Sequence, residues 1–161
     1  MKKITLLISM LLLCLFKANA QEPKFVSIEP ANRNVLIEEF TGRNCGWCPL
    51  GQKTVNNIIK NNPGRVFTIN IHSQSSLSPT SYPNLNTLKG ADIAKAFSDG
   101  SLPQAVVNRS TEKAVGLYTT ADKWAPMTNE QLQQAAECNI AGQVEINKET
   151  RLAKITVEVY Y

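Results

Sequence analysis

The sequence is poor in metal-binding side chains, since its 161 residues include four cysteines and one histidine, His72. A structural zinc site takes four ligands, usually two cysteine pairs or a cysteine pair with a histidine pair. Cys45 and Cys48 could supply half of such a site, but Cys138 and His72 do not follow at a suitable spacing. Copper, which suits thiolate and imidazole ligands, is a minor alternative. We therefore expect no metal and no other cofactor.

A strong charge of either sign is also missing, with 17 basic and 13 acidic residues. No basic stripe is interleaved with aromatic side chains, so a nucleic-acid partner is not expected. After residue 20, no apolar run is long enough to cross a bilayer.

The first twenty residues have the pattern of a secretory signal peptide. Lys2 and Lys3 precede a largely apolar stretch over 4–16, and the small residues at 18–20 fit a cleavage site. A buried N-terminal helix is the alternative. Cleavage would also remove Lys17, leaving fourteen basic and thirteen acidic residues and a net charge of +1. We therefore expect an exported protein.

Three cysteines would remain after cleavage: Cys45, Cys48 and Cys138. Disulfides persist in exported proteins, and the closeness of Cys45 and Cys48 in the sequence makes them natural partners. Cys138 is then left over. Its simplest interpretation is a small buried hydrophobic side chain.

The rest of the chain alternates strand-like and helix-like segments, which predicts an α/β fold with helices on both sides of a central mixed sheet. Thr128 and Gln131 form a capping-box pattern, which predicts a helix from Thr128 to about Cys138. The other expected elements are strands over 34–40, 65–71 and 105–108, a hairpin partner over 114–118, a short edge strand over 25–28, helices over 49–60 and 91–97, and an irregular insertion over 73–90.

The pattern changes after Cys138. Residues 143–146 and 152–160 alternate like strands across a turn at 147–150. A lone hairpin is marginally stable in water. We therefore expect the hairpin over 139–161 to be the start of a β-rich domain that this chain does not complete.

The Cys45-Gly46-Trp47-Cys48 motif falls between a predicted strand and a predicted helix. Unpaired amides and the helix dipole stabilise a thiolate at a helix N-terminus, and a thiolate is the nucleophile of disulfide exchange. Cys45 would attack, and Cys48 would resolve the mixed disulfide. A purely structural Cys45–Cys48 disulfide is the main alternative, since secreted cysteines usually pair.

The segment from Val35 to Cys48 resembles thioredoxin: an apolar strand ending in an acid and a phenylalanine, a short loop, then C-G-x-C. Glu39 lies six residues before Cys45, where thioredoxins keep a buried aspartate that handles protons for the second cysteine. The resemblance implies this role for Glu39, and burial would raise its pKa. A solvated carboxylate is the alternative, since Glu38 and Glu39 point to opposite faces and only one needs to be buried.

A second thioredoxin feature is Leu102-Pro103, which precedes the short predicted strand over 105–108. Thioredoxins place a cis-proline at this point, beside the cysteine pair. The resemblance implies that Pro103 is cis and that the backbone of Leu102 pairs with an extended substrate. It assigns Trp47 to substrate binding as well. An ordinary trans-proline loop is the alternative.

Three further features resemble the 28-kDa outer membrane protein family of Gram-negative bacteria: Glu-Glu-Phe-Thr-Gly before Cys-Gly-Trp-Cys-Pro, a histidine after the next strand, and Leu-Pro-x-x-x-x-Asn-Arg. Members of this family join a thioredoxin-like domain to a C-terminal β domain. The resemblance implies a thioredoxin-like domain over 21–138, a periplasmic or outer-membrane-associated location, and protein dithiols or disulfides as partners. A non-enzymatic surface or adhesion protein is the alternative.

If Cys45 is the attacking thiol, iodoacetamide should alkylate it faster than Cys48 or Cys138 in the reduced protein, because the helix N-terminus stabilises its thiolate. Mass spectrometry after short exposures gives the order of labelling. Faster labelling of Cys48 would contradict the assignment.

Overall fold

The structure is a computed structural model that describes residues 25–72, 76–116 and 123–161. The predicted signal peptide over 1–20 lies outside the described residues. The chain divides into two compact units. The larger covers 30–137, and the smaller combines 25–29 with 138–161. Nowhere in the described ranges is there a helix long and apolar enough to cross a membrane.

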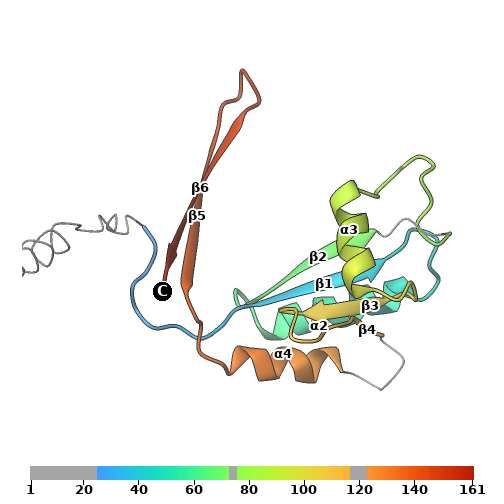
Figure 1. Ribbon diagram of the computed structural model, residues 1–161, viewed down its shortest axis with the longest axis horizontal. Coiled ribbons are helices and arrows are strands. Elements are labelled where there is room, and N and C mark those ends of the chain that lie inside the picture. The colour runs from blue at the N-terminus through green and yellow to red at the C-terminus, as the bar shows by residue number, and fades with distance from the viewer. Residues whose placement is uncertain (1–24, 73–75, 117–122) are drawn as a thin grey trace, which may run out of the picture. The chain divides into compact units, whose positions relative to one another are not determined.

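A four-stranded mixed sheet forms the centre of the larger unit (Figure 1). Its order is β2-β1-β3-β4, with β1 parallel to β2 and antiparallel to β3, and with β3 antiparallel to β4. This confirms the predicted α/β fold with a mixed sheet. The elements are β1 Val35–Thr41, α2 Cys48–Asn61, β2 Val66–His72, α3 Leu88–Phe97, β3 Gln104–Val107, β4 Val115–Gly116 and α4 Trp124–Leu132.

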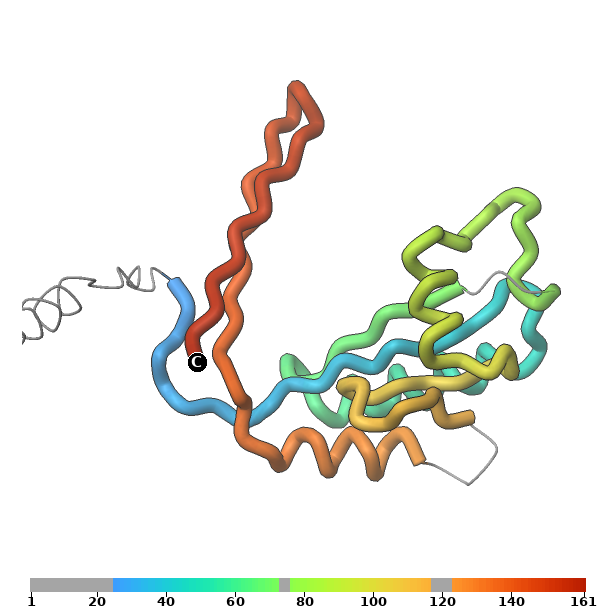
Figure 2. The backbone as a smooth tube through the Cα atoms, in the orientation of Figure 1, coloured from blue at the N-terminus to red at the C-terminus, as the bar shows by residue number. Residues whose placement is uncertain are grey.

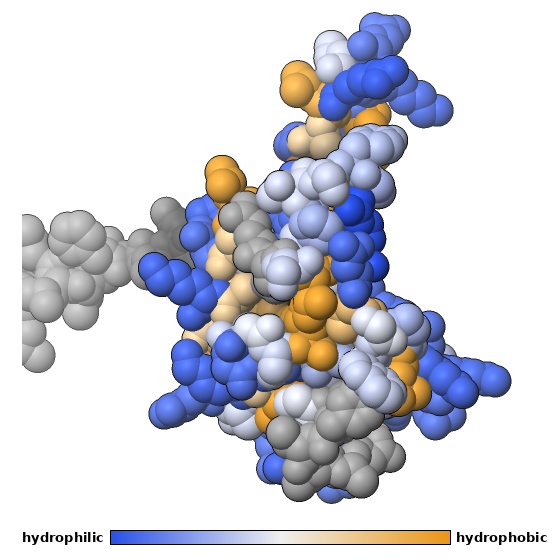
Figure 3. All heavy atoms as spheres, turned by 90° about the vertical axis from the view of Figure 1, so that its right-hand side faces the viewer, coloured by the Kyte–Doolittle hydropathy of each residue, from blue (hydrophilic) through white to orange (hydrophobic). Residues whose placement is uncertain are grey.

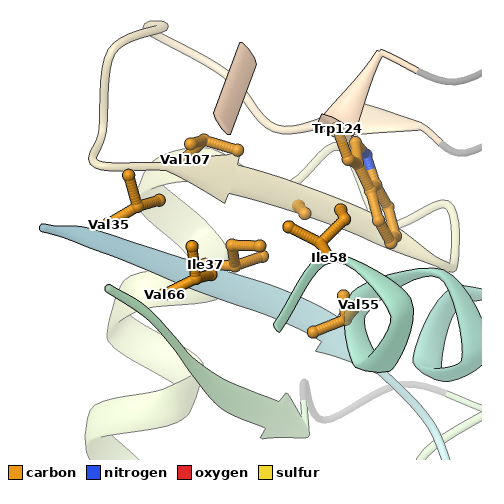
Figure 4. Close-up of a cluster of buried hydrophobic side chains, with 8 residues drawn as sticks. Val35, Ile37, Val55, Ile58, Val66, Val107 and Trp124 are labelled. Atoms are coloured by element: carbon orange, nitrogen blue, oxygen red, sulfur yellow. The ribbon is translucent and has the colours of Figure 1, made fainter. Parts of the chain in front are cut away.

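Helices cover both faces of this sheet because side chains alternate along its central strand. Val35 and Ile37 of β1 pack on one face with residues of α2 and α4 (Figure 4). Phe40 packs on the other face with Ala94 of α3. The Trp124 side chain is 1% exposed in the first core, and its indole N–H donates to the Val115 carbonyl of β4. The result is the three-layer arrangement that the sequence predicts.

The capping-box prediction at Thr128 is wrong. Helix α4 begins at Trp124, four residues earlier, and ends at Leu132. Thr128 is fully buried inside the helix, where its hydroxyl donates to the Trp124 carbonyl at 2.8 Å. Burial of the Trp124 indole against the sheet places the first turn of the helix there. The side-chain cap that the structure does contain is Thr87, whose hydroxyl accepts the Gly90 N–H at the start of α3.

Two other element predictions need correction. The edge strand expected over 25–28 does not form, because the N–H groups of Phe25 and Val26 donate to the Glu158 carboxylate rather than to a neighbouring strand. The hairpin partner expected over 114–118 is shorter at its start, since β4 begins at Val115. Its last two expected residues lie outside the described residues.

The smaller unit contains a second, two-stranded sheet, drawn in orange to red in Figure 2. Its antiparallel strands are β5 Asn139–Ile146 and β6 Ala153–Tyr160. The predicted hairpin is confirmed, but β5 begins four residues before the expected 143. Cross-strand pairs such as Ile140 with Val159 and Val144 with Ile155 place apolar side chains on one face of this ribbon.

Candidate redox site

Cys45 and Cys48 form a disulfide at the N-terminal end of α2. The two Cα atoms are 5.4 Å apart, and both residues are buried, with 7% and 5% exposure. The Cys48 N–H donates to the Sγ of Cys45 at 3.1 Å, so the sulfur of Cys45 receives an amide of the first helical turn. This is the location in which a thiolate on Cys45 gains most from the helix N-terminus.

The N-cap residue of α2 provides no side-chain cap, and no negative charge lies in the first turn of the helix. Trp47 occupies the N-cap position and makes no side-chain capping hydrogen bond, and the first turn holds no acidic residue. Pro49 fits the first turn because a proline lacks the N–H that would be unpaired there. The partial positive charge of the helix is therefore directed at the cysteine pair rather than at a carboxylate cap.

Glu39 is the buried acid of the site. It lies on the face of β1 that carries Ile37, under α2, and its side chain has no exposure to solvent. Neither carboxylate oxygen has a hydrogen-bond partner among the described residues. Burial therefore raises its pKa from 4.5 to about 7. The predicted burial and raised pKa of Glu39 are confirmed, while its role as a proton acceptor stays a prediction.

Gly51, in the second turn of α2, makes room for this carboxylate. A Cβ at this position would lie 2.6 Å from Oε1 of Glu39 and 3.0 Å from Cβ of Pro103. Glycine costs about 1 kcal/mol relative to alanine inside a helix, but here a Cβ would force the Glu39 carboxylate to shift. Sequence reasoning missed Gly51, although an isolated glycine in a helical pattern often marks such a close approach.

The Leu102–Pro103 peptide bond is cis, as predicted. Pro103 lies against Gly51 of α2, one turn after Cys48. Glu39 lies against the same glycine, so Pro103 and Glu39 are close to each other. Leu102 lies beside the loop that carries the cysteines. Its Cδ1 is 3.1 Å from the position that a Cβ of Gly42 would take. The structure thus brings four predicted residues together around the first two turns of α2: Glu39, Cys45, Cys48 and Pro103.

Trp47 lies at the surface between the two cysteines and is 64% exposed. Its exposure and the position of Leu102 next to the cysteine loop are compatible with contact to a substrate. Substrate binding by both residues stays a prediction.

Glu38 is also buried. The sequence required only one of the two glutamates to be buried, and in the structure both are. Glu38 is 5% exposed on the opposite face, where Arg109 donates to both of its carboxylate oxygens at 2.8 and 2.7 Å. The Arg109 guanidinium also lies 5.0 Å from the centre of the Phe97 ring. Glu38 therefore has a counter-charge, whereas Glu39 has none among the described residues. Sequence reasoning included Arg109 in a family motif but missed its pairing with Glu38, which is 71 residues away.

His72, at the end of β2, is not part of a metal cluster. Its Nδ1 lies 3.2 Å from the hydroxyl of Ser78, and burial lowers the pKa of its imidazole. Within the described ranges, no three or more side chains of His, Cys, Asp or Glu gather closely enough to hold a metal ion. Cys138 is a free, partly buried thiol.

Comparison with known proteins supports the fold but not a family. No protein-family model matches the sequence, and no curated protein matches it. The chain is similar to the solved structure of HBP35 of Porphyromonas gingivalis, with a TM-score of 0.51 and 19% identity over 70% of this chain. The match spans 37% of that protein's chain. At this identity the likeness concerns the fold alone, and the resemblance to the 28-kDa outer membrane protein family stays a prediction.

The buried carboxylate predicts a pH-dependent stability. Because the pKa of Glu39 is raised in the folded state, its stabilising contribution is present below pH 4.5 and is lost as the pH rises through 7. Glu39→Gln removes this titration. We compare the free energy of unfolding of the disulfide-bonded variant with that of the wild type. The difference, variant minus wild type, should be about 3 kcal/mol larger at pH 8 than at pH 4.

Urea unfolding of both proteins between pH 4 and 8 measures this difference. Glu130→Gln, which removes an exposed carboxylate of α4, is the matched control and should follow the wild type. Parallel pH profiles for wild type and Glu39→Gln would show that Glu39 does not change its protonation state on folding.

Proposed function

We propose that this protein exchanges disulfides with protein dithiols or disulfides through Cys45 and Cys48. One observation carries the proposal: α2, which begins at the Cys45–Cys48 disulfide, packs through Gly51 against the carboxylate of Glu39. This carboxylate is buried with no hydrogen-bond partner among the described residues, and its pKa is about 7. A disulfide with a purely structural role does not need a proton acceptor packed against the helix that carries it. Such an acid is costly to bury, which favours a chemical role over a packing role.

The reaction proceeds in two attacks. A substrate thiolate attacks Sγ of Cys45, the bond to Cys48 breaks, and Cys48 leaves as a thiolate. A second substrate thiolate attacks the mixed disulfide and releases Cys45. The substrate forms a disulfide and loses two electrons and two protons, while the protein gains both electrons and both protons. The reverse sequence reduces a substrate disulfide.

Glu39 serves the proton transfer at Cys48. A carboxyl group with a pKa near 7 is well matched to donate a proton to the Cys48 thiolate in one direction and to accept it in the other. Glu38 is unsuited to this role because Arg109 holds its carboxylate on the opposite face of the sheet. We assign the contact with the substrate backbone to Leu102 and Pro103, and an apolar contact to Trp47.

We further propose that the exchange takes place outside the cytoplasm, in the periplasm or at the outer membrane. The support is the signal-peptide pattern of residues 1–20 and the resemblance to an outer membrane protein family. An exported redox protein meets the protein thiols and disulfides that the proposed chemistry needs.

The competing function is a non-enzymatic surface or adhesion protein in which the Cys45–Cys48 bond is structural. The low exposure of both cysteines favours it. A reduction potential distinguishes the two functions. The protein is equilibrated in dithiothreitol or glutathione buffers, and its thiols are trapped and counted by mass spectrometry.

We expect a reduction potential above about −300 mV, since structural disulfides of secreted proteins typically lie below this value. Cys138→Ser removes the third thiol and should leave the potential unchanged. A potential below about −300 mV would favour the structural disulfide.

Glu39→Gln should slow exchange with a protein disulfide at pH 7 on the order of a hundredfold, because a positioned acid or base typically contributes at least this much. The defect should shrink above about pH 8.5, where a free cysteine ionises unaided. Stopped-flow exchange rates across this pH range measure the effect, with Glu130→Gln as the control. A uniform defect at every pH would point to a structural role for Glu39.

A further inference from the structure

Residues 76–87 lie between β2 and α3 and are the described part of the insertion that the sequence predicts over 73–90, before α3 begins at Leu88. They are termed the insertion below and carry no charged side chain. Three of their larger apolar or aromatic side chains are accessible to solvent. Leu77 is 37% exposed, Leu85 is 51% exposed and Tyr82 is 95% exposed. Figure 3 faces the end of the larger unit where this loop lies and shows apolar side chains at the surface among hydrophilic ones.

The insertion is attached directly to the loop that carries Cys45. The Asn44 N–H donates to the Leu77 carbonyl at 2.8 Å. The guanidinium of Arg43 donates to the carbonyls of Ser81 and Pro83 at 3.2 and 3.1 Å and to the Ser81 hydroxyl at 2.8 Å. Both residues that precede Cys45 therefore hold the insertion in place.

Gly42 lies where the insertion and the cis-proline loop meet the cysteine loop. A Cβ at this position would overlap the Leu77 carbonyl oxygen and would lie 3.1 Å from Cδ1 of Leu102. The Gly42 carbonyl accepts the Cys45 N–H at 3.1 Å. The main chain of Leu77 and the side chain of Leu102 thus both lie against the turn that leads to Cys45.

A second attachment fixes the other side of the insertion. Ser78 is 2% exposed, and its hydroxyl donates to the Asn86 side-chain carbonyl while lying 3.2 Å from the His72 ring. The Asn86 amide donates back to the carbonyls of Ser78 and Pro79. Leu77 is therefore held between two anchored points, and its position is defined by hydrogen bonds on both sides.

We propose that Leu77 is a specificity-determining residue of the redox site, and that the preferred substrate is a polypeptide with an aliphatic side chain next to its reacting cysteine. This inference rests on the proposed function. The main chain of Leu77 lies against Gly42 and Asn44, close to Cys45 in the chain, and its aliphatic side chain is 37% exposed. An aliphatic neighbour of a reacting cysteine would gain burial against this side chain. Glutathione, whose groups flanking the cysteine are polar and charged, gains no such burial.

The test uses the oxidised full chain and two dithiol peptides that differ only in a leucine or a serine next to the first cysteine. In each reaction the peptide forms a disulfide and the Cys45–Cys48 bond is reduced to two thiols. Thiol trapping with iodoacetamide followed by mass spectrometry gives the second-order rate constants. We expect the wild type to prefer the leucine peptide by roughly tenfold, the ratio expected from partial burial of one aliphatic side chain.

Leu77→Ser should reduce this preference to twofold or less while leaving the rates with the serine peptide and with glutathione unchanged. Leu77→Ala, a smaller change in polarity, should give an intermediate preference. Leu85→Ser is the matched control, since Leu85 is exposed in the same insertion, and it should retain the wild-type ratio.

Three results would overturn the inference while leaving the proposed function intact. The first two are a wild type that reacts with both peptides without preference and a Leu77→Ser variant that keeps the tenfold ratio. Loss of the preference in Leu85→Ser as well would assign it to the whole loop rather than to Leu77, which also overturns the inference. If the wild-type disulfide reacts with neither peptide, the proposed function fails and the inference fails with it.

Discussion

The carboxylate of Glu39, buried without a counter-charge, is the constraint around which the site is arranged. The acid reaches the underside of α2 because it shares a face of β1 with Val35 and Ile37, which anchor the same strand to the hydrophobic core. Glycine at position 51 lets helix α2 approach the carboxylate without displacing it. The helix that carries the disulfide is thus positioned by ordinary core packing, and Glu39 takes a place on the core-facing side of β1.

The two adjacent glutamates show how one strand provides two different electrostatic environments. Alternation directs Glu38 toward the face covered by α3, where the Arg109 side chain neutralises it and packs over Phe97. Glu39 points to the face covered by α2, where its carboxylate has no hydrogen-bond partner among the described residues. The first glutamate is fixed as an anion by its partner. The second has a pKa near neutrality, which leaves it able to change its protonation state.

The sequence was sufficient to predict the features that local pattern determines. The strand before the motif, the helix after Cys48, the cis bond at Pro103 and the burial of Glu39 all follow from residues close to one another or from the thioredoxin resemblance. The start of α4 was not predicted, because Thr128 fits a capping box locally while burial of Trp124 against the sheet determines where the helix begins. The partnership of Glu38 with Arg109 was missed because it joins β1 to the turn after β3, 71 residues away, and no local pattern specifies it.

The space at Gly51 also couples two positions of the chain. A larger residue at 51 and the observed placement of the Glu39 carboxylate are in conflict, because the Cβ would lie 2.6 Å from the carboxylate oxygen and one of the two groups would have to move. Shortening the acid by one methylene would withdraw that oxygen and relieve the nearer of the contacts at 51. In related sequences, the size of the residue in the helix should therefore vary inversely with the length of the acid in the strand, twelve positions earlier.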